Sequence, residues 1–365
     1  MGLTAGIVGL PNVGKSTLFN AITKKNILAA NYPFATIDPN VGIVTVPDER
    51  LAKLEEMVMP ENVVPTSFEF TDIAGLVKGA SNGEGLGNKF LSHIREVDAI
   101  CEVVRCFDDE NITHVEGNTD PIRDIEIIKL ELIFSDLDII NTRLGKIEKK
   151  AVSTKDKDAL FEVELLKKIK TALESNVPAR YLEYSDDEER IIKSYSLLTK
   201  KPVIYMANVK EEDIINGNKY VDIVKEYASK ENSEVIMLCA KTESELSELN
   251  DEDKLMFLEE LGLNESGLDK LIKAVYSLLG LATYFTAGPK EVKAWTFKKG
   301  MKAPECAGII HSDFEKGFIR AEVISYEDYV KYNGEKGCKE SGKMRLEGKE
   351  YVMQDGDICH FRFNV

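Results

Sequence analysis

The sequence predicts an α/β protein: a nucleotide domain on a mostly parallel sheet, an inserted α-helical coiled-coil hairpin and a small C-terminal β-rich domain. Three observations carry this prediction. A phosphate-binding pattern lies between an apolar run and a helical pattern near the N-terminus, an apolar heptad starts at residue 130, and short strands with aromatic residues follow residue 283. The expected boundaries are 1–280 for the nucleotide domain, interrupted by the hairpin at 125–200, and 281–365 for the C-terminal domain.

The phosphate-binding pattern is GLPNVGKS at residues 9–16, which matches the P-loop consensus G-x-x-x-x-G-K-[ST]. Its glycines let the backbone wrap a phosphate, its lysine reaches the outer phosphates, and its hydroxyl binds Mg²⁺. Residues 5–8 have the apolar character of a buried parallel strand, and residues 17–23 have helical spacing. The motif therefore predicts a P-loop NTPase site with Mg²⁺, in which the phosphates contact Asn12, Val13, Gly14, Lys15, Ser16 and Thr17.

Two segments after the P-loop are predicted to respond to the terminal phosphate. Residues 31–38 are polar and contain a proline, and in GTPase-type P-loop hydrolases a threonine in such a loop completes the Mg²⁺ shell, so Thr36 is the candidate. A strand pattern ends in DIAG, where Asp72 would hold Mg²⁺ through water and the Gly75 amide would sense the phosphate. A glycine-rich run follows, which suits a segment that orders around a ligand. The simpler alternatives are a surface threonine and a flexible linker.

Several segments of the chain together are typical of one protein family. They are GLPNVGKST at 9–17, DIAG at 72–75, GEGLGNKFL at 83–91, HSDFEKGFIRAE at 311–322 and the ending with DGD at 355–357 and FRF at 361–363. The first three resemble the Obg branch of the translation-factor-related GTPases, and the whole chain is similar to YchF, the Obg-like ATPase family. The resemblance implies an Mg²⁺-dependent ATPase that binds the ribosome or ribosomal RNA.

The middle of the chain predicts an antiparallel helical hairpin, each arm extending about 30 to 40 Å. Apolar residues recur at alternating gaps of three and four, a polar break follows at 153–157, and a second helical pattern returns. Residues 141–171 hold nine Lys or Arg against five Asp or Glu, although the whole chain has a net charge of −16. A local basic surface on an acidic body suits an RNA partner, and a solvated charged helix is the alternative. The apolar positions are Leu130, Ile133, Leu137, Ile140, Leu144 and Ile147, then Val163, Leu166, Ile169 and Leu173.

The segment that would contact the base predicts ATP rather than GTP. GTPases place N-K-x-D after the corresponding strand, and this chain has Asn208-Val-Lys-Glu. The Asp of the GTPase motif accepts two hydrogen bonds from guanine, whereas adenine presents an unprotonated ring nitrogen that a carboxylate repels. With Val209 and Glu211 in the motif, we expect the guanine preference to be lost. Asn208 would bond to the edge of adenine and, as the resemblance suggests, the backbone at Val209 would complete that contact.

The position after Gly75 predicts slow hydrolysis. It holds Leu76, which cannot orient water, where many GTPases have glutamine. The family resemblance suggests His114 as the catalytic assistant, since an imidazole can orient or deprotonate water near neutral pH. An exposed histidine without a catalytic role is the alternative. In related GTPases that lack the glutamine, an Asn at the position of Asn12 helps to hold K⁺, which suggests K⁺ as a second cofactor.

The C-terminal part resembles the TGS module, a β-grasp fold found in RNA- and ribosome-associated proteins. The absence of a leader and of a membrane-length apolar run predicts a cytoplasmic protein with no membrane partner. We also expect a monomer, and the charge gives no indication of DNA sequence recognition. Six cysteines without C-x-x-C spacing are expected to be reduced packing residues. The main hypothesis is a slow ATPase switch on the ribosome; the alternatives are a nucleotide-sensing RNA or ribosome interaction protein with incidental hydrolysis, or a GTP-preferring Obg-type GTPase.

Overall fold

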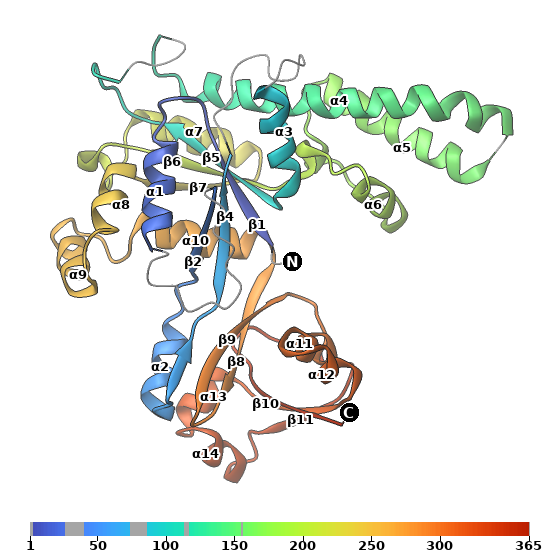
Figure 1. Cartoon of the computed structure of the whole chain (residues 1–365). Helices are drawn as coiled ribbons and strands as arrows, with labels where there is room; N and C mark the ends of the chain where they lie inside the picture. Colours follow the sequence, from blue (N-terminus) through green and yellow to red (C-terminus); the bar gives the residue numbers. More distant parts are fainter. Residues whose placement is uncertain (1–2, 26–39, 74–85, 113–116, 155, 365) are drawn as a thin grey trace. The chain divides into compact units, whose positions relative to one another are not determined.

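The computed structural model describes residues 3–25, 40–73, 86–112, 117–154 and 156–364. The chain divides by its internal contacts into two compact units. The first comprises Met1–Val44 and Glu69–Leu271, and the second comprises Thr45–Phe68 and Ile272–Val365. Figure 1 shows the elements of each unit. The predicted α/β class, with a P-loop nucleotide domain, a helical insertion and a separate C-terminal domain, is confirmed.

The first unit is built on a six-stranded sheet whose central strands are parallel, as predicted. β1 pairs in parallel with both β4 and β5, and β5, β6 and β7 continue the parallel ladder. All seven residues of β5 are buried, as expected for a strand that is covered on both faces. In spatial order the strands are β2 (Val41–Thr45), β4 (Ser67–Asp72), β1 (Thr4–Val8), β5 (Ala99–Arg105), β6 (Val203–Asn208) and β7 (Glu234–Leu238).

Helices that connect these strands, or that follow β7 in the chain, surround the sheet (Figure 1). Several begin at polar caps, because the first amides of a helix lack partners within it. Asn218, for example, accepts from the amides of Tyr220 and Val221. The helices are α1 (Lys15–Lys25), α3 (Leu86–Glu96), α7 (Lys219–Lys230), α8 (Ala240–Leu246), α9 (Asp251–Glu260) and α10 (Gly267–Leu278).

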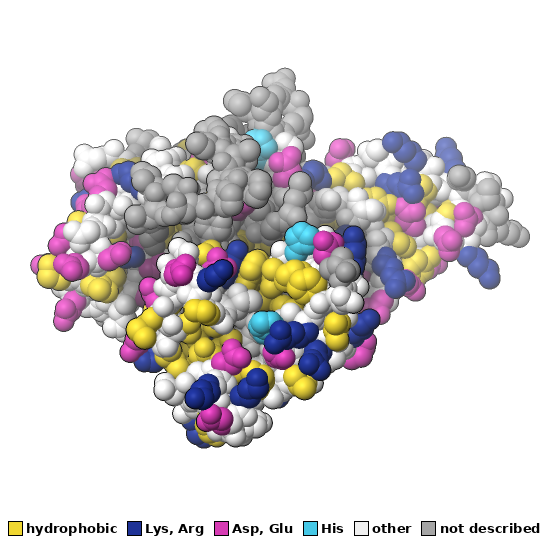
Figure 2. Space-filling view, turned by 60° about the horizontal axis from the view of Figure 1, so that its bottom comes forward, with side chains coloured by type: hydrophobic (Ala, Val, Ile, Leu, Met, Phe, Trp, Pro, Cys, Tyr) yellow, Lys and Arg dark blue, Asp and Glu magenta, His cyan; other side chains and the backbone are white. Residues whose placement is uncertain are grey.

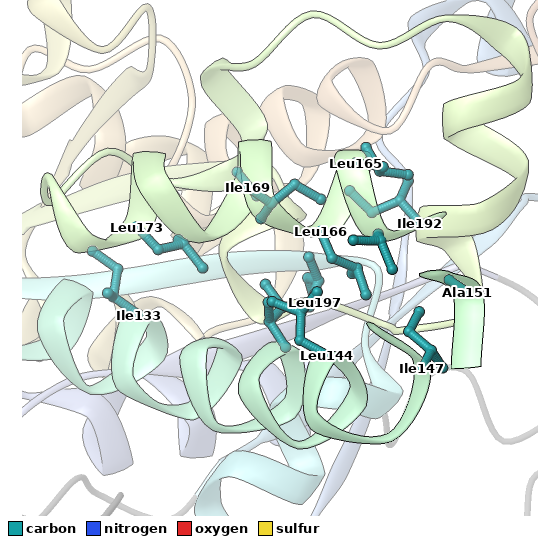
Figure 3. Close-up of a cluster of buried hydrophobic side chains, with 13 residues drawn as sticks. Ile133, Leu144, Ile147, Ala151, Leu165, Leu166, Ile169, Leu173, Ile192 and Leu197 are labelled. Carbon is teal, nitrogen blue, oxygen red and sulfur yellow. The ribbon is translucent and has the colours of Figure 1, made fainter. Parts of the chain in front are cut away.

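The insertion is a helical hairpin of α4 (Pro121–Thr154) and α5 (Lys157–Glu174), followed by α6 (Asp186–Lys193). The predicted heptad is confirmed: most of its apolar side chains are buried between the helices, and Leu130 alone of those named is more than a third exposed. Figure 3 shows residues of both helices pointing toward one another. α6 begins with a capping box between Ser185 and Glu188.

The two arms differ in length, which corrects the expectation of similar arms. At 1.5 Å per residue, the 34 residues of α4 span about 51 Å and the 18 residues of α5 about 27 Å. The difference arises because α4 begins at Pro121, well before the segment that pairs with α5. On the hairpin, Lys and Arg side chains are interspersed with Asp and Glu (Figure 2), and several form ion pairs such as Lys167 with Glu148 and Arg143 with Glu162.

The second unit has a mixed six-stranded sheet. β8 pairs antiparallel with β9, and β10 pairs antiparallel with β12, whereas β12–β8 and β3–β9 are parallel. Tyr284 and Phe285 are neighbours on β8, so they point to opposite faces, and each belongs to a different buried cluster. The strands in order are β11 (Arg345–Glu347), β10 (Phe318–Ile324), β12 (Ile358–Phe363), β8 (Leu281–Ala287), β9 (Glu291–Lys298) and β3 (Asn62–Val64).

Of the described helices that lie wholly in this unit, the longest is α2, which lies in the N-terminal part of the sequence, far from the C-terminal residues that form the rest of the unit. α2 supplies Leu51 and Leu54 to the cluster that contains Phe285, and β3 pairs with the edge of β9. Residues 45–68 therefore join the C-terminal residues in one core. The helices are α2 (Glu49–Val58), α11 (Ala303–Ile310), α12 (Ser312–Lys316), α13 (Tyr326–Lys331) and α14 (Glu335–Glu340).

All six cysteines are buried and free, as predicted. Burial raises the pKa of the Cys106 thiol to about 12, which keeps that thiol protonated at neutral pH. Among the residues that the structure describes, no helix has both the length and the apolar character needed to cross a membrane.

Candidate nucleotide site

The P-loop connects the end of β1 to the start of α1, as the sequence predicts. Two of its residues have left-handed backbone: Asn12 with φ 63° and Gly14 with φ 98°. A Cβ atom on Gly14 would lie 2.2 Å from the side-chain nitrogen of Asn208, and one on Gly9 would lie 2.9 Å from Val13. Both consensus glycines are therefore required by close contacts, and Gly14 is required by its backbone conformation as well.

Lys15 and Asp72, predicted to act on the phosphates and on the metal, lie next to each other. The Lys15 ammonium forms an ion pair with the Asp72 carboxylate, and only 9% of Lys15 is exposed. The register explains the proximity, because Asp72 pairs with Ile7 on β1, just before the P-loop begins. Ser16 and Thr17 are exposed on the first turn of α1. The structure thus brings a cation, a carboxylate and two hydroxyls to one edge of the sheet.

Asn208 connects the P-loop to the start of α8 and to the residue after β5 through hydrogen bonds. Its side-chain nitrogen donates to the Val13 carbonyl at 2.8 Å, and its side-chain oxygen accepts from the Ala240 amide at 2.9 Å. Its own carbonyl accepts from the Cys106 amide at 2.8 Å. Three separate segments therefore meet at one residue, two of them through its side chain. One amide N–H and one lone pair remain for a ligand, so its role at the base edge stays a prediction.

A pocket of about 770 Å³ opens beside the P-loop. This volume lies within the range of small-molecule and cofactor sites. The wall consists of P-loop residues, the loop after β5, the turn after β6, the start of α8 and the end of α9. Among the predicted residues, those at the pocket are Asn12, Gly14, Thr17, Asn208, Val209 and Glu211.

The turn after β6 differs from the expected arrangement in one detail. Val209 is only 2% exposed, and its amide donates to the Leu238 carbonyl at 2.9 Å, so its N–H is already used by the sheet. Its carbonyl, together with the carboxylates of Glu211 and Glu212, is what this turn offers to a base at the pocket. The predicted contact from the Val209 backbone is thus restricted to its oxygen.

Three predicted residues, Thr36, Gly75 and His114, lie outside the described residues, as does Leu76. Within the part of the chain that is described, no group of three or more His, Cys, Asp or Glu side chains is placed to hold a metal. P-loop sites do not need such a group, because Mg²⁺ takes a hydroxyl, phosphate oxygens and its own water. Ser16 and Asp72 fit that requirement.

The loop at 107–112 is the part of the site that the sequence analysis missed. Phe107, Asp109 and Ile112 line the pocket, and so do Glu260 and Leu261 of the α9 end. None of these residues belongs to a short motif. The only available signal was position, since the loop follows a buried parallel strand and ligands bind at the carboxyl ends of such strands.

Together, the fold and the site define a P-loop NTPase of the GTPase type, with a helical insertion. Residues 4–135 match the family model MMR_HSR1, described as "50S ribosome-binding GTPase". Residues 281–364 match YchF-GTPase_C, described as "Protein of unknown function (DUF933)".

Full-length relatives make the assignment more specific. The chain is 66% identical over 367 residues to the "Ribosome-binding ATPase YchF" of Bacillus subtilis (strain 168) and 56% identical over 365 residues to that of Haemophilus influenzae, each match covering 100% of both chains. It is also similar to a solved structure, "Structure of the Schizosaccharomyces pombe YchF GTPase", with 44% identity and a TM-score of 0.90, covering 99% of this chain and 97% of that chain. The chain belongs to the YchF family, as its sequence motifs predicted; the wider Obg grouping and the TGS assignment stay predictions.

Proposed function

We propose that this protein is an Mg²⁺-dependent nucleoside triphosphate hydrolase that prefers ATP to GTP and acts as a slow nucleotide switch on the ribosome. The observation that carries the proposal is the pocket of about 770 Å³ that opens against the P-loop. The bacterial relatives are named ribosome-binding ATPases, and the matching N-terminal model is described as a ribosome-binding GTPase. The two names differ in the base of the nucleotide, adenine for an ATPase and guanine for a GTPase. The turn after β6 is the segment that would contact this base.

The phosphate end supports the hydrolase part of the proposal. Lys15 and the amides of residues 12–17 would bind the phosphates, while Ser16 directly, Thr36 directly and Asp72 through water would hold Mg²⁺. When bound, Mg²⁺ neutralises charge on the transferred phosphoryl group. Lys15 lies in contact with Asp72, so a short movement of the ammonium toward the phosphates would free that carboxylate for the metal's water.

The reaction is attack of water on the terminal phosphorus, with ADP as the leaving group. The Gly75 amide would contact the terminal phosphate, and Leu76 leaves the attacking water without a side chain to orient it. Hydrolysis is therefore slow in the isolated protein. His114 is the proposed proton acceptor for that water, and K⁺ held beside Asn12 is the second proposed means of stabilising charge in the transition state.

The preference for ATP is supported by the turn after β6. Glu211 is one methylene longer than the Asp of the guanine motif, and Val209 occupies the position of its Lys. Loss of a bidentate bond between a carboxylate and guanine weakens guanine binding by about ten- to a hundredfold. The Val209 carbonyl remains available to accept from the 6-amino group of adenine; guanine carries a carbonyl oxygen at that position, which cannot donate.

Calorimetric titration of the whole chain with Mg²⁺ and non-hydrolysable analogues of ATP and GTP tests the nucleotide part. We expect a lower Kd for the ATP analogue, by about tenfold or more, because specificity needs only a modest difference in binding free energy. A lower Kd for the GTP analogue would overturn the proposed preference and favour a GTP-dependent protein.

Co-sedimentation with ribosomes tests the partner. Binding should weaken steeply with salt, because contacts with RNA release counterions. Reversal of Lys149, Lys150, Lys167 and Lys168 to Glu should weaken it if the hairpin carries the contact. The matched control reverses four lysines outside the hairpin to Glu, with an equal change of charge: Lys219, Lys225, Lys230 and Lys270, all exposed. Equal co-sedimentation of both variants would place the contact on another surface.

The switch is tested in the same experiment by comparing ATP, ADP and no nucleotide. We expect the amount bound to depend on nucleotide, and Ser16→Ala to remove that dependence. If equal amounts of protein bind to ribosomes in all three conditions, the result would favour an interaction protein with incidental hydrolysis. A monomer in the cytoplasm is part of the same proposal, and the molecular mass measured by light scattering checks the monomer.

A further inference from the structure

The loop that follows β5 forms one wall of the pocket. Three of its residues, Phe107, Asp109 and Ile112, line the cavity, as do residues of the turn after β6. The two segments start from paired positions, since Arg105 at the end of β5 is aligned with Asn208 at the end of β6. The position of this loop therefore contributes to the shape of the pocket.

A single buried side chain holds all three of these residues. Arg105 is 2% exposed, and its guanidinium donates from Nε to the Phe107 carbonyl at 3.0 Å, from Nη1 to the Ile112 carbonyl at 3.0 Å and from Nη2 to the Asp109 carbonyl at 3.3 Å. The same group lies over the Phe107 ring, 4.7 Å from its centroid. Each residue that the loop contributes to the pocket thus has its carbonyl bonded to one nitrogen of Arg105.

The chemistry of these bonds requires arginine. A guanidinium presents donors on three nitrogens in a fixed plane, so it can bond to carbonyls from three parts of a turn at once. A lysine ammonium is a compact point charge and cannot span them. Burying a cation costs free energy that carbonyl dipoles must offset, and an apolar residue would fill the same volume without that cost. The feature that only arginine supplies is the fixed geometry of the loop.

We propose that Arg105 is a positioning residue of the nucleotide pocket, which holds the loop at 107–112 as the wall against the base and ribose. The inference rests on the proposed nucleotide binding and deepens it. Arg105 acts on the base end alone, because within the described part of the chain its side-chain hydrogen bonds go to this loop and not to the P-loop. Its loss should therefore weaken binding of a nucleoside triphosphate without weakening binding of a bare polyphosphate.

Two weaker bonds hold the same loop and permit a graded test. The Thr119 hydroxyl donates to the Phe107 carbonyl at 3.2 Å, and the Tyr220 hydroxyl donates to the Asp108 carboxylate at 2.8 Å. The bond from Tyr220 lowers the pKa of the Asp108 carboxyl, so this residue is ionised at neutral pH. Removing both hydroxyls should loosen the loop while Arg105 stays in place.

The test compares two ligands on the same protein, with Mg²⁺ present. For Arg105→Lys we expect the Kd for an ATP analogue to rise by about tenfold or more, because bonds from a charged donor to two of the three carbonyls are lost. The Kd for inorganic tripolyphosphate should stay within about twofold, since that ligand contacts only the phosphate end. In steady-state hydrolysis, KM for ATP should rise while kcat stays unchanged. Arg180→Lys is the matched control, because Arg180 donates to the Thr199 carbonyl and lies outside the pocket.

Two results would overturn the assignment: an unchanged Kd for the ATP analogue, or an equal loss for both ligands. If Arg105→Lys does not fold, judged by its thermal melt, the double variant Thr119→Val with Tyr220→Phe decides. It should weaken binding of the ATP analogue about fivefold or more, as expected for the loss of one neutral hydrogen bond and one to a carboxylate, and leave binding of tripolyphosphate unchanged. A wild-type protein that binds no nucleotide overturns the proposed function itself, whereas wild-type binding with an unaffected variant overturns only the role of Arg105.

Discussion

The phosphate end and the base end of the pocket are built in opposite ways. The phosphate end comes from one continuous stretch, residues 9–17, with Asp72 added from the neighbouring strand. The base end is assembled from the ends of three parallel strands, and two of its lining segments lie about a hundred residues apart in the sequence, at Phe107 and at Asn208. Asn208 joins the two ends, since it bonds to the Val13 carbonyl.

This difference shows what kind of site a sequence motif can reveal. A phosphate is bound by backbone amides and one lysine, so its site needs a particular local conformation, and local conformation is encoded in consecutive residues. A base is bound by shape and by hydrogen bonds at its edge, so its site needs walls at the correct separation. The separation depends on the sheet and on the Arg105 bonds, neither of which has a local signature.

The largest effect on hydrolysis and ligand binding should come from a substitution at the phosphate end of the pocket. Replacing Lys15 by Met removes the charge that contacts the outer phosphates, so hydrolysis should fall by about a hundredfold or more. Binding of tripolyphosphate and of the ATP analogue should weaken together, unlike in the Arg105 variant. Phosphate release and calorimetry measure the two quantities.

Lys24→Met is the control for this variant. Lys24 lies on the same helix, is exposed and pairs with Glu248 away from the P-loop. Its hydrolysis rate should equal that of the wild type. A wild-type rate in Lys15→Met would remove the phosphate role of this lysine.

The next largest effect should come from the base end. Val209→Lys combined with Glu211→Asp restores the arrangement of the guanine motif, so the ratio of the Kd values for GTP and ATP should shift toward GTP by about tenfold or more. Tripolyphosphate binding should not change. Titration with the two analogues measures the ratio.

Glu212→Asp is the matched control for the base end, because Glu212 also lines the pocket but lies outside the motif. In Glu212→Asp, the ratio of the Kd values for GTP and ATP should equal that of the wild type. If the ratio of the Kd values for GTP and ATP is unchanged in the Val209 and Glu211 variant, other residues that line the pocket determine which base is preferred.

The same distinction between local and non-local information explains which parts of the fold were predictable. The hairpin followed from its heptad because α4 and α5 are adjacent in sequence and pack through regular spacing, and Ile140, Leu144 and Leu166 are buried as expected. The capping box at Ser185 was equally local. The length of α4 was not predicted, since nothing in the heptad marks where a helix begins beyond its paired segment.

The grouping of residues 45–68 with the C-terminal residues had no sequence signal. Leu51 and Leu54 have ordinary amphipathic spacing, which indicates a buried face but not the core that buries it. The short strand Asn62–Val64 gains its partner, β9, from more than two hundred residues later. Arg105 in the site is a different case. Its three carbonyl partners lie only two to seven residues further along the chain, but no sequence motif marks a buried arginine at the end of an apolar strand as the residue that holds a loop.

The smallest effect should come from the monovalent ion, again at the phosphate end. Hydrolysis should rise several-fold when K⁺ replaces Na⁺ at equal ionic strength, because an ion beside Asn12 would stabilise charge that Leu76 cannot. Equal rates in the two salts would exclude K⁺ as a cofactor. Phosphate release at saturating ATP measures the effect on the chemical step.

The backbone at Asn12 requires two variants rather than one. With φ at 63°, this residue occupies the left-handed region, which asparagine and glycine tolerate better than alanine. Asn12→Ala removes the side chain and adds strain, whereas Asn12→Gly removes the side chain alone. If the side chain helps to hold K⁺, both variants lose the stimulation, and the Kd for the ATP analogue in Asn12→Gly stays within about twofold of the wild-type value. If only Asn12→Ala loses it, the P-loop conformation is responsible and the asparagine oxygen is not a K⁺ ligand.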